Sequence, residues 1–136
     1  MYLKKALTLA DAKAIAAAAE AEARKNEWRV TIAVLDEGGN LLYLQRGDEA
    51  PPGSIVVSQE KARTAFLFKR PTKGIEEAVA GGRLVMMSLP GATPIEGGLP
   101  LFNQGSIIGA IGVSGVQSPQ DAQVAYAGAA VAAELA

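Results

Sequence analysis

The residue with the clearest chemical potential is Glu96, which stands in the segment PIEGGLPL between an apolar residue and two glycines. Prolines on both sides fix the backbone, whereas Gly97 and Gly98 can take positive φ or let a ligand approach the main chain. Glu96 could transfer protons at the rim of a pocket, and the two glycine N–H groups could bind an anion. A solvated carboxylate on a turn explains the segment equally well, so both interpretations stay open.

A second group of polar side chains lies in the segment QEKARTAF. Lys61 or Arg63 could point at a bound carboxylate, and arginine suits that role because its planar guanidinium can grip both oxygens. Thr64 shares a helix face with Glu60 one turn earlier. The alternative is an ordinary solvated charged face. The candidate ligand-binding residues are therefore Lys61, Arg63, Thr64, Glu96, Gly97 and Gly98, with Glu96 also the candidate catalytic residue.

The composition excludes several classes of function. The 136 residues include 13 basic and 14 acidic side chains, for a net charge of -1, so no nucleic acid or anionic membrane is expected as a partner. The absence of cysteine excludes disulfides and thiolate metal sites. The absence of histidine excludes serine–histidine triads and histidine-ligated zinc, and we expect no metal site. With no signal peptide and no stretch of ~20 apolar residues, the sequence favours a cytoplasmic protein.

Four helices are expected to position these residues. Thr8 and Asp11 form a capping-box-like start, and apolar residues then recur at helical spacing. Thr72 is expected to cap a short helix that ends at two glycines, and Ser118-Pro119 opens the last helix. The predicted helices are 9–25, 54–69, 72–80 and 118 to the end of the chain.

The remaining apolar segments predict five strands. Residues 28–36 and 41–46 flank the turn DEGGN as a hairpin, and 98–103 and 106–115 form a second hairpin. The apolar run LVMMSL, residues 84–89, predicts a buried strand between them. Strands grouped in hairpins with helices between them indicate an antiparallel sheet with helices on its faces, an α+β fold. We expect residues 1–136 to form a single domain, since no linker or repeat interrupts them.

Four segments together resemble one known family. They are VLDEGGNLLYLQR, RGDEAPPGSIVVSQEKARTA, PIEGGLPL and GSIIGAIGVSG followed by QDAQVA. In this combination and order they resemble the GlcG/HbpS-like family, the so-called haem-degrading domains, to which the C-terminal domain of PduO-type corrinoid adenosyltransferases is related. The resemblance spans nearly the whole chain.

The resemblance implies a profilin-like fold with a five-stranded antiparallel sheet between helical layers. Members are described as haem-binding proteins, as sensors of haem or corrinoid, and as accessory proteins of catabolic pathways, and they commonly form symmetric oligomers. Haem is therefore a candidate cofactor, although this chain has no histidine to serve as its axial ligand. Tyr2, Tyr43 and Tyr126, or a lysine or methionine, would have to replace it.

Two main hypotheses for function follow. The first is a small-molecule-binding protein that holds haem, another tetrapyrrole or an acidic metabolite. The second is an enzyme in which Glu96 transfers a proton on a small carboxylate substrate; a purely structural subunit is a third option. A homo-oligomer is expected in each case, because the alanine-rich faces 16–23 and 125–133 would let helices approach closely. The same faces could instead pack within one chain.

Overall fold

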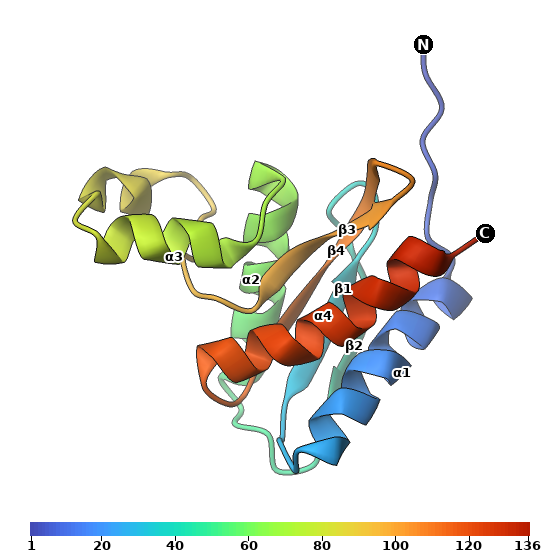
Figure 1. Cartoon of the computed structure of the whole chain (residues 1–136), viewed down its shortest axis with the longest axis horizontal. Coiled ribbons are helices and arrows are strands. Elements are labelled where there is room, and N and C mark those ends of the chain that lie inside the picture. The colour runs from blue at the N-terminus through green and yellow to red at the C-terminus, as the bar shows by residue number, and fades with distance from the viewer.

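The computed structural model describes residues 1–136 and confirms the predicted helices and both hairpins (Figure 1). The capping box opens the first helix as expected, since the Asp11 N–H donates to Thr8 Oγ1 at 3.0 Å and the Thr8 N–H to Asp11 Oδ2 at 2.9 Å. The helices are α1 (Leu9–Lys25), α2 (Ser54–Phe68), α3 (Thr72–Ala80) and α4 (Ser118–Glu134), with a short 3-10 helix η1 (Leu84–Ser88). The strands are β1 (Thr31–Leu35), β2 (Leu41–Arg46), β3 (Gly98–Asn103) and β4 (Ser106–Ser114).

The four strands form one antiparallel sheet in the order β2-β1-β4-β3. Helices α1 and α4 lie side by side on one face, and α2 covers the other (Figure 1). The architecture is therefore α+β, as predicted. No helix combines the length and the apolar character that crossing a membrane requires.

The prediction of five strands is wrong, because LVMMSL forms η1 instead of a strand. Its backbone bonds are local: the Met86 N–H donates to the Arg83 carbonyl and the Leu89 N–H to the Met86 carbonyl. Periodicity cannot separate a short apolar run in a strand from one in a helix. The segment is also not buried, since Leu84, Val85 and Met87 are each more than 60% exposed.

The alanine-rich faces form the main core together with one face of the sheet. Ala16 and Ala19 of α1 and Ala125 and Ala132 of α4 are all fully buried within the single chain. The small side chains let the two helices pack closely against each other and against the sheet. The alanines therefore serve packing inside the chain, which was the alternative to self-association.

Helix α2 lies directly against β3 and β4 because two glycines face it. A Cβ at Gly112 would collide with the Ser58 carbonyl, and one at Gly98 with the Lys61 carbonyl. Beyond α2 the chain continues into α3 and η1, which project away from the sheet as an arm (Figure 1). The segment that returns from this arm to β3 carries Glu96.

Candidate functional site

Two threonines fix the segment that carries Glu96. The hydroxyl of Thr64 on α2 accepts from the Thr93 N–H at 2.8 Å and can donate its one proton to the Glu60 carbonyl at 2.8 Å or to the Gly91 carbonyl at 3.2 Å. The hydroxyl of Thr72 accepts from the Gly98 N–H at 3.0 Å. Thr72 therefore joins α3 to β3 and does not cap its helix as expected, because Pro71 occupies the N-cap.

Glu96 is a nearly buried carboxylate without a partner. The residue is 9% exposed, and its side chain makes no hydrogen bond and no ion pair. Its oxygens keep some contact with solvent, because no fully buried polar atom in the chain lacks a partner. The backbone N–H of Glu96 donates to Oε1 of Glu76 on α3 at 3.2 Å, so a second carboxylate contacts the backbone of this segment.

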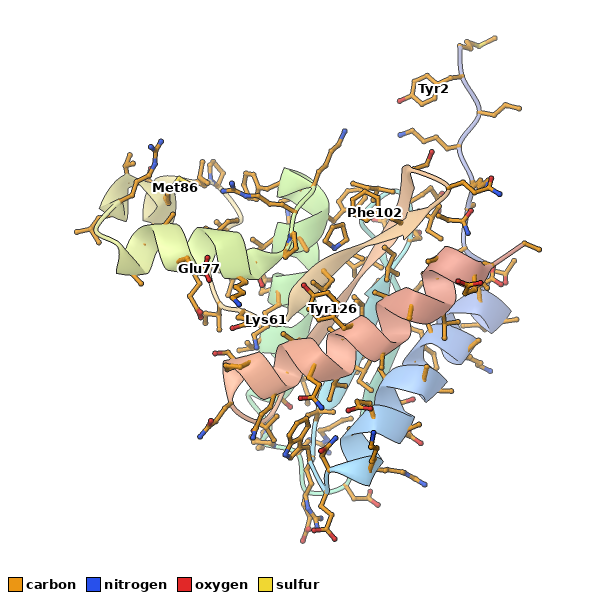
Figure 2. All side chains as sticks on the ribbon, viewed as in Figure 1. Tyr2, Lys61, Glu77, Met86, Phe102 and Tyr126 are labelled. Atoms are coloured by element: carbon orange, nitrogen blue, oxygen red, sulfur yellow. The ribbon has the colours of Figure 1, made fainter.

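Lys61 lies behind this segment in a buried ion pair. Its Nζ is 2.9 Å from Oδ2 of Asp121 and 3.0 Å from the Val113 carbonyl, and both charged side chains are 2% exposed (Figure 2). The other oxygen of Asp121 accepts from the Val116 N–H at 3.1 Å. Burial raises the pKa of Asp121, against the opposing attraction of Lys61. The pair joins α2, β4 and α4. Lys61, which we expected to bind a ligand, is therefore already paired with a carboxylate of the chain.

The two glycines after Glu96 make room for this ion pair. Gly97 has a φ of +132°, and a Cβ there would lie 2.7 Å from the Val113 carbonyl oxygen and 2.9 Å from Nζ of Lys61. Gly98 packs on the backbone of Lys61, and its N–H is taken by Thr72. A purely structural requirement therefore explains both glycines.

The structure brings together five of the six predicted ligand-binding residues. Lys61, Thr64, Glu96, Gly97 and Gly98 are all buried around the start of β3, whereas Arg63 is exposed on the outer side of α2. No arginine or lysine of the predicted set is thus left free beside Glu96. No group of three or more acidic side chains is arranged to hold a metal ion.

Sequence reasoning missed Asp121 and Glu76, the two carboxylates that bond to residues of this cluster. Asp121 is an acid in the first turn of a helix, and Glu76 lies inside a short helix, so neither position stood out in the sequence. The role of Asp121 becomes visible only in the structure, where it is paired with Lys61 of α2. An acid that follows Ser-Pro-Gln at a helix start carries no such signal.

An apolar groove lies next to this cluster, between β3 and α4. Its volume is about 180 Å³, and the aromatic rings of Phe102 from β3 and Tyr126 from α4 border it (Figure 2). These rings are 46% and 57% exposed. The other lining residues are Pro71, Leu99, Pro100, Ala129 and Ala133. Glu96 is not part of this groove, although it precedes Leu99 by only three residues.

Comparison with known proteins identifies a family and a relative that match most of this chain. A family model described as "Haem degrading protein HbpS-like" matches residues 7–130. Protein GlcG of Escherichia coli K12 is 52% identical over 114 residues, which is 84% of this chain and 85% of GlcG.

Solved structures agree with this match. The crystal structure of Klebsiella pneumoniae protein ORFY superposes with a TM-score of 0.90 and 34% identity, covering 100% of this chain and 97% of ORFY. A structure described as a PduOC:haem complex superposes with a TM-score of 0.83 and 26% identity, covering 93% and 95% of the two chains.

Proposed function

Because the chain belongs to the family of HbpS-like proteins, we propose that it binds a small molecule, and that this ligand is haem or another flat tetrapyrrole. The observation that carries the proposal is the apolar groove between β3 and α4, with two aromatic rings exposed at its edge. The likeness to a protein crystallised with haem supports this choice. An acidic metabolite is less well supported, because Lys61 is paired with Asp121 and Arg63 points away from the cluster.

The groove suits one face of a planar ligand. Its volume of about 180 Å³ is below the roughly 300–1,000 Å³ of sites that enclose a whole ligand. Apolar side chains line it, and aromatic rings such as that of Phe102 stack well on a flat ring system. A tetrapyrrole would lie against this surface with its second face open to solvent or to another subunit.

Tyr126 is the residue best placed to bind the iron of a haem. The chain has no histidine, and a tyrosine phenolate can serve as an axial haem ligand. Of the three tyrosines, Tyr2 precedes α1 and is 80% exposed, and the Tyr43 hydroxyl donates to Gln45 at 3.3 Å. Tyr126 alone lines the groove. A bound haem, held by Tyr126 and the apolar groove, would supply an iron for redox or ligand-binding chemistry.

Titration with haemin tests this function. We expect a saturable shift of the Soret band with one haem per groove and an absorption spectrum typical of tyrosine-ligated ferric haem. Protoporphyrin without iron should bind more weakly, because it lacks the bond to Tyr126 but keeps the stacking. An unsaturable, linear increase in absorbance at micromolar protein would reject specific binding.

We propose a second candidate function on the evidence of Glu96 alone: proton transfer on a small carboxylate substrate. A carboxylate that is 9% exposed and makes no hydrogen bond or ion pair is free to exchange a proton with a bound substrate. Proton NMR of glycolate in D₂O is a direct test, since a base that removes the α-proton exchanges it for deuterium. Exchange catalysed by the wild type and lost in Glu96→Gln supports the function; no exchange by the wild type rejects it.

We also propose that the chain forms a homo-oligomer through the projecting arm. Leu84, Val85 and Met87 of η1 are 61–66% exposed, and Ile95 and Leu67 are 40% and 44% exposed. Several large apolar side chains exposed on one short helix are typical of interfaces. Sedimentation of Leu84→Glu should show smaller particles than the wild type. Leu41→Glu, on the opposite edge strand β2, is the matched control and should leave the mass unchanged. A monomeric wild type would contradict the proposal.

A further inference from the structure

A second cavity lies far from Glu96, at the end of the molecule where α1 ends and β1 begins (the lower end in Figure 1). Its volume is about 510 Å³, within the range of small-ligand sites. The buried side chains of Ala23, Val30 and Ile32 form its apolar part, and the half-buried Trp28 lies beside them. The cavity therefore has room for a ligand with an apolar body.

The charges in this cavity leave a negative surplus. Arg24 is paired with Glu20 at 3.5 Å, and Arg29 is paired with Glu49. Glu27 and Asp48 also line the cavity, and neither has an ion pair or a side-chain hydrogen bond. Both arginines are thus compensated, whereas two carboxylates are not.

The backbone adds to this negative potential. The cavity lies at the C-terminal end of α1, where the helix dipole places a partial negative charge. The amide of Gln45, another lining residue, is already engaged, because its Nε2 donates to Glu20 and its Oε1 accepts from the Tyr43 hydroxyl. The carbonyls of Ala23 and Arg24 at the helix end already accept from backbone N–H groups of residues 26–28, so the groups that remain for a ligand are two carboxylates and an indole ring.

We propose that this cavity binds a small organic cation, such as a quaternary ammonium. Indole is the aromatic ring that attracts cations most strongly, and the apolar part of the cavity would accept the alkyl groups around the nitrogen. Glu27 and Asp48 would supply the compensating charge. An inorganic cation would gain little here, since it could not use the apolar surface. This binding does not depend on the function of Tyr126 or Glu96.

The fluorescence of Trp28 provides a direct test, because it is the only tryptophan in the chain. Choline chloride is the probe, and sodium chloride at equal concentration controls for ionic strength. We expect a saturable change at millimolar choline. The uncharged analogue 3,3-dimethyl-1-butanol has the same shape without the charge, and it should bind at least about fivefold more weakly.

Variants of the lining residues separate charge from shape. Glu27→Gln and Asp48→Asn remove the two free carboxylates, and each should weaken choline binding by up to about fivefold in calorimetry. Glu134→Gln removes an exposed carboxylate at the end of α4 and should leave binding unchanged. All three positions are exposed, so folding can be checked by circular dichroism and should be retained.

Three results would overturn the proposal. The first is the absence of saturation with choline in both fluorescence and calorimetry. The second is equal binding of the uncharged analogue, which would mark an apolar cavity without preference for a cation. The third is saturable binding of sodium acetate in place of choline, which would show that Arg24 and Arg29 control the site.

Discussion

Nζ of Lys61 lies 2.9 Å from Oδ2 of Asp121, and both side chains are almost fully buried between α2, β4 and α4. The two residues are 60 positions apart in sequence, and the chain between them includes the arm and the Glu96 segment. Gly97 exists as glycine partly because this ammonium stands where its Cβ would be. The pair thus determines how the segment with Glu96 can be placed.

Removing the cation of this pair should be strongly destabilising. Lys61→Met leaves Asp121 buried without its counter-charge, and we expect the free energy of unfolding to fall by about 3–5 kcal/mol in urea titrations. The matched control is the exposed pair of Lys73 and Glu77, 3.8 Å apart on α3. Lys73→Met should cost at most about 1 kcal/mol. Equal effects of the two substitutions would show that the buried pair has no special structural role.

The raised pKa of Asp121 predicts a specific pH dependence. A carboxyl with a raised pKa binds its proton more tightly in the folded state than in the unfolded state. Protonation therefore stabilises the fold, and this gain grows as pH falls from above the folded pKa toward the ordinary value of 3.8. The free energy of unfolding of the wild type should therefore rise relative to that of Asp121→Asn as pH is lowered through this window. If the wild type instead loses stability relative to the variant, the attraction of Lys61 outweighs burial and the pKa is lowered.

Gly97→Ala should destabilise the protein by about 1–3 kcal/mol. Alanine at a φ of +132° is strained, and its Cβ would meet the Val113 carbonyl and the Lys61 ammonium. Gly53→Ala is the matched control, because Gly53 has helical backbone angles and no atom lies within 4 Å of the added Cβ. That substitution should be neutral or raise the midpoint of thermal unfolding slightly. A neutral Gly97→Ala would contradict the packing described here.

Glu96→Gln should stabilise the protein by about 0.5–1 kcal/mol. The substitution removes a nearly buried charge that has no hydrogen-bond or ion-pair partner. Stabilisation on loss of a charge is typical of residues kept for function. Glu134→Gln, at an exposed position, should change the free energy of unfolding by less than about 0.5 kcal/mol. A loss of stability in Glu96→Gln would show that the carboxylate makes a favourable interaction absent from this structure.

The local parts of the fold could be predicted from sequence. The capping box at Thr8 and the turn DEGGN act over a few residues, and the structure has both where they were expected. The prediction of a strand at LVMMSL was wrong because its apolar run has no periodicity, and its backbone hydrogen bonds form locally within η1. The prediction of Thr72 as a helix cap was also wrong, since its hydroxyl accepts from the N–H of Gly98 in β3.

The candidate site could be predicted only in part. Lys61, Thr64 and the two glycines do lie around the segment with Glu96, and their binding of a ligand stays a prediction. The role of Lys61 could not be foreseen, because charged side chains are rarely buried and its partner Asp121 lies on another element. The groove at Tyr126 depends on the contact of β3 with α4, which no local pattern specifies.

A haemin titration of Tyr126→Phe beside the wild type tests the proposed function most directly. We expect the wild type and the control Tyr2→Phe to give the same saturable Soret shift, since Tyr2 lies outside the groove. Tyr126→Phe keeps the ring and loses the phenol oxygen, so it should lose the tyrosinate spectrum and bind haemin about tenfold or more weakly. An unchanged spectrum and affinity in Tyr126→Phe would contradict the account.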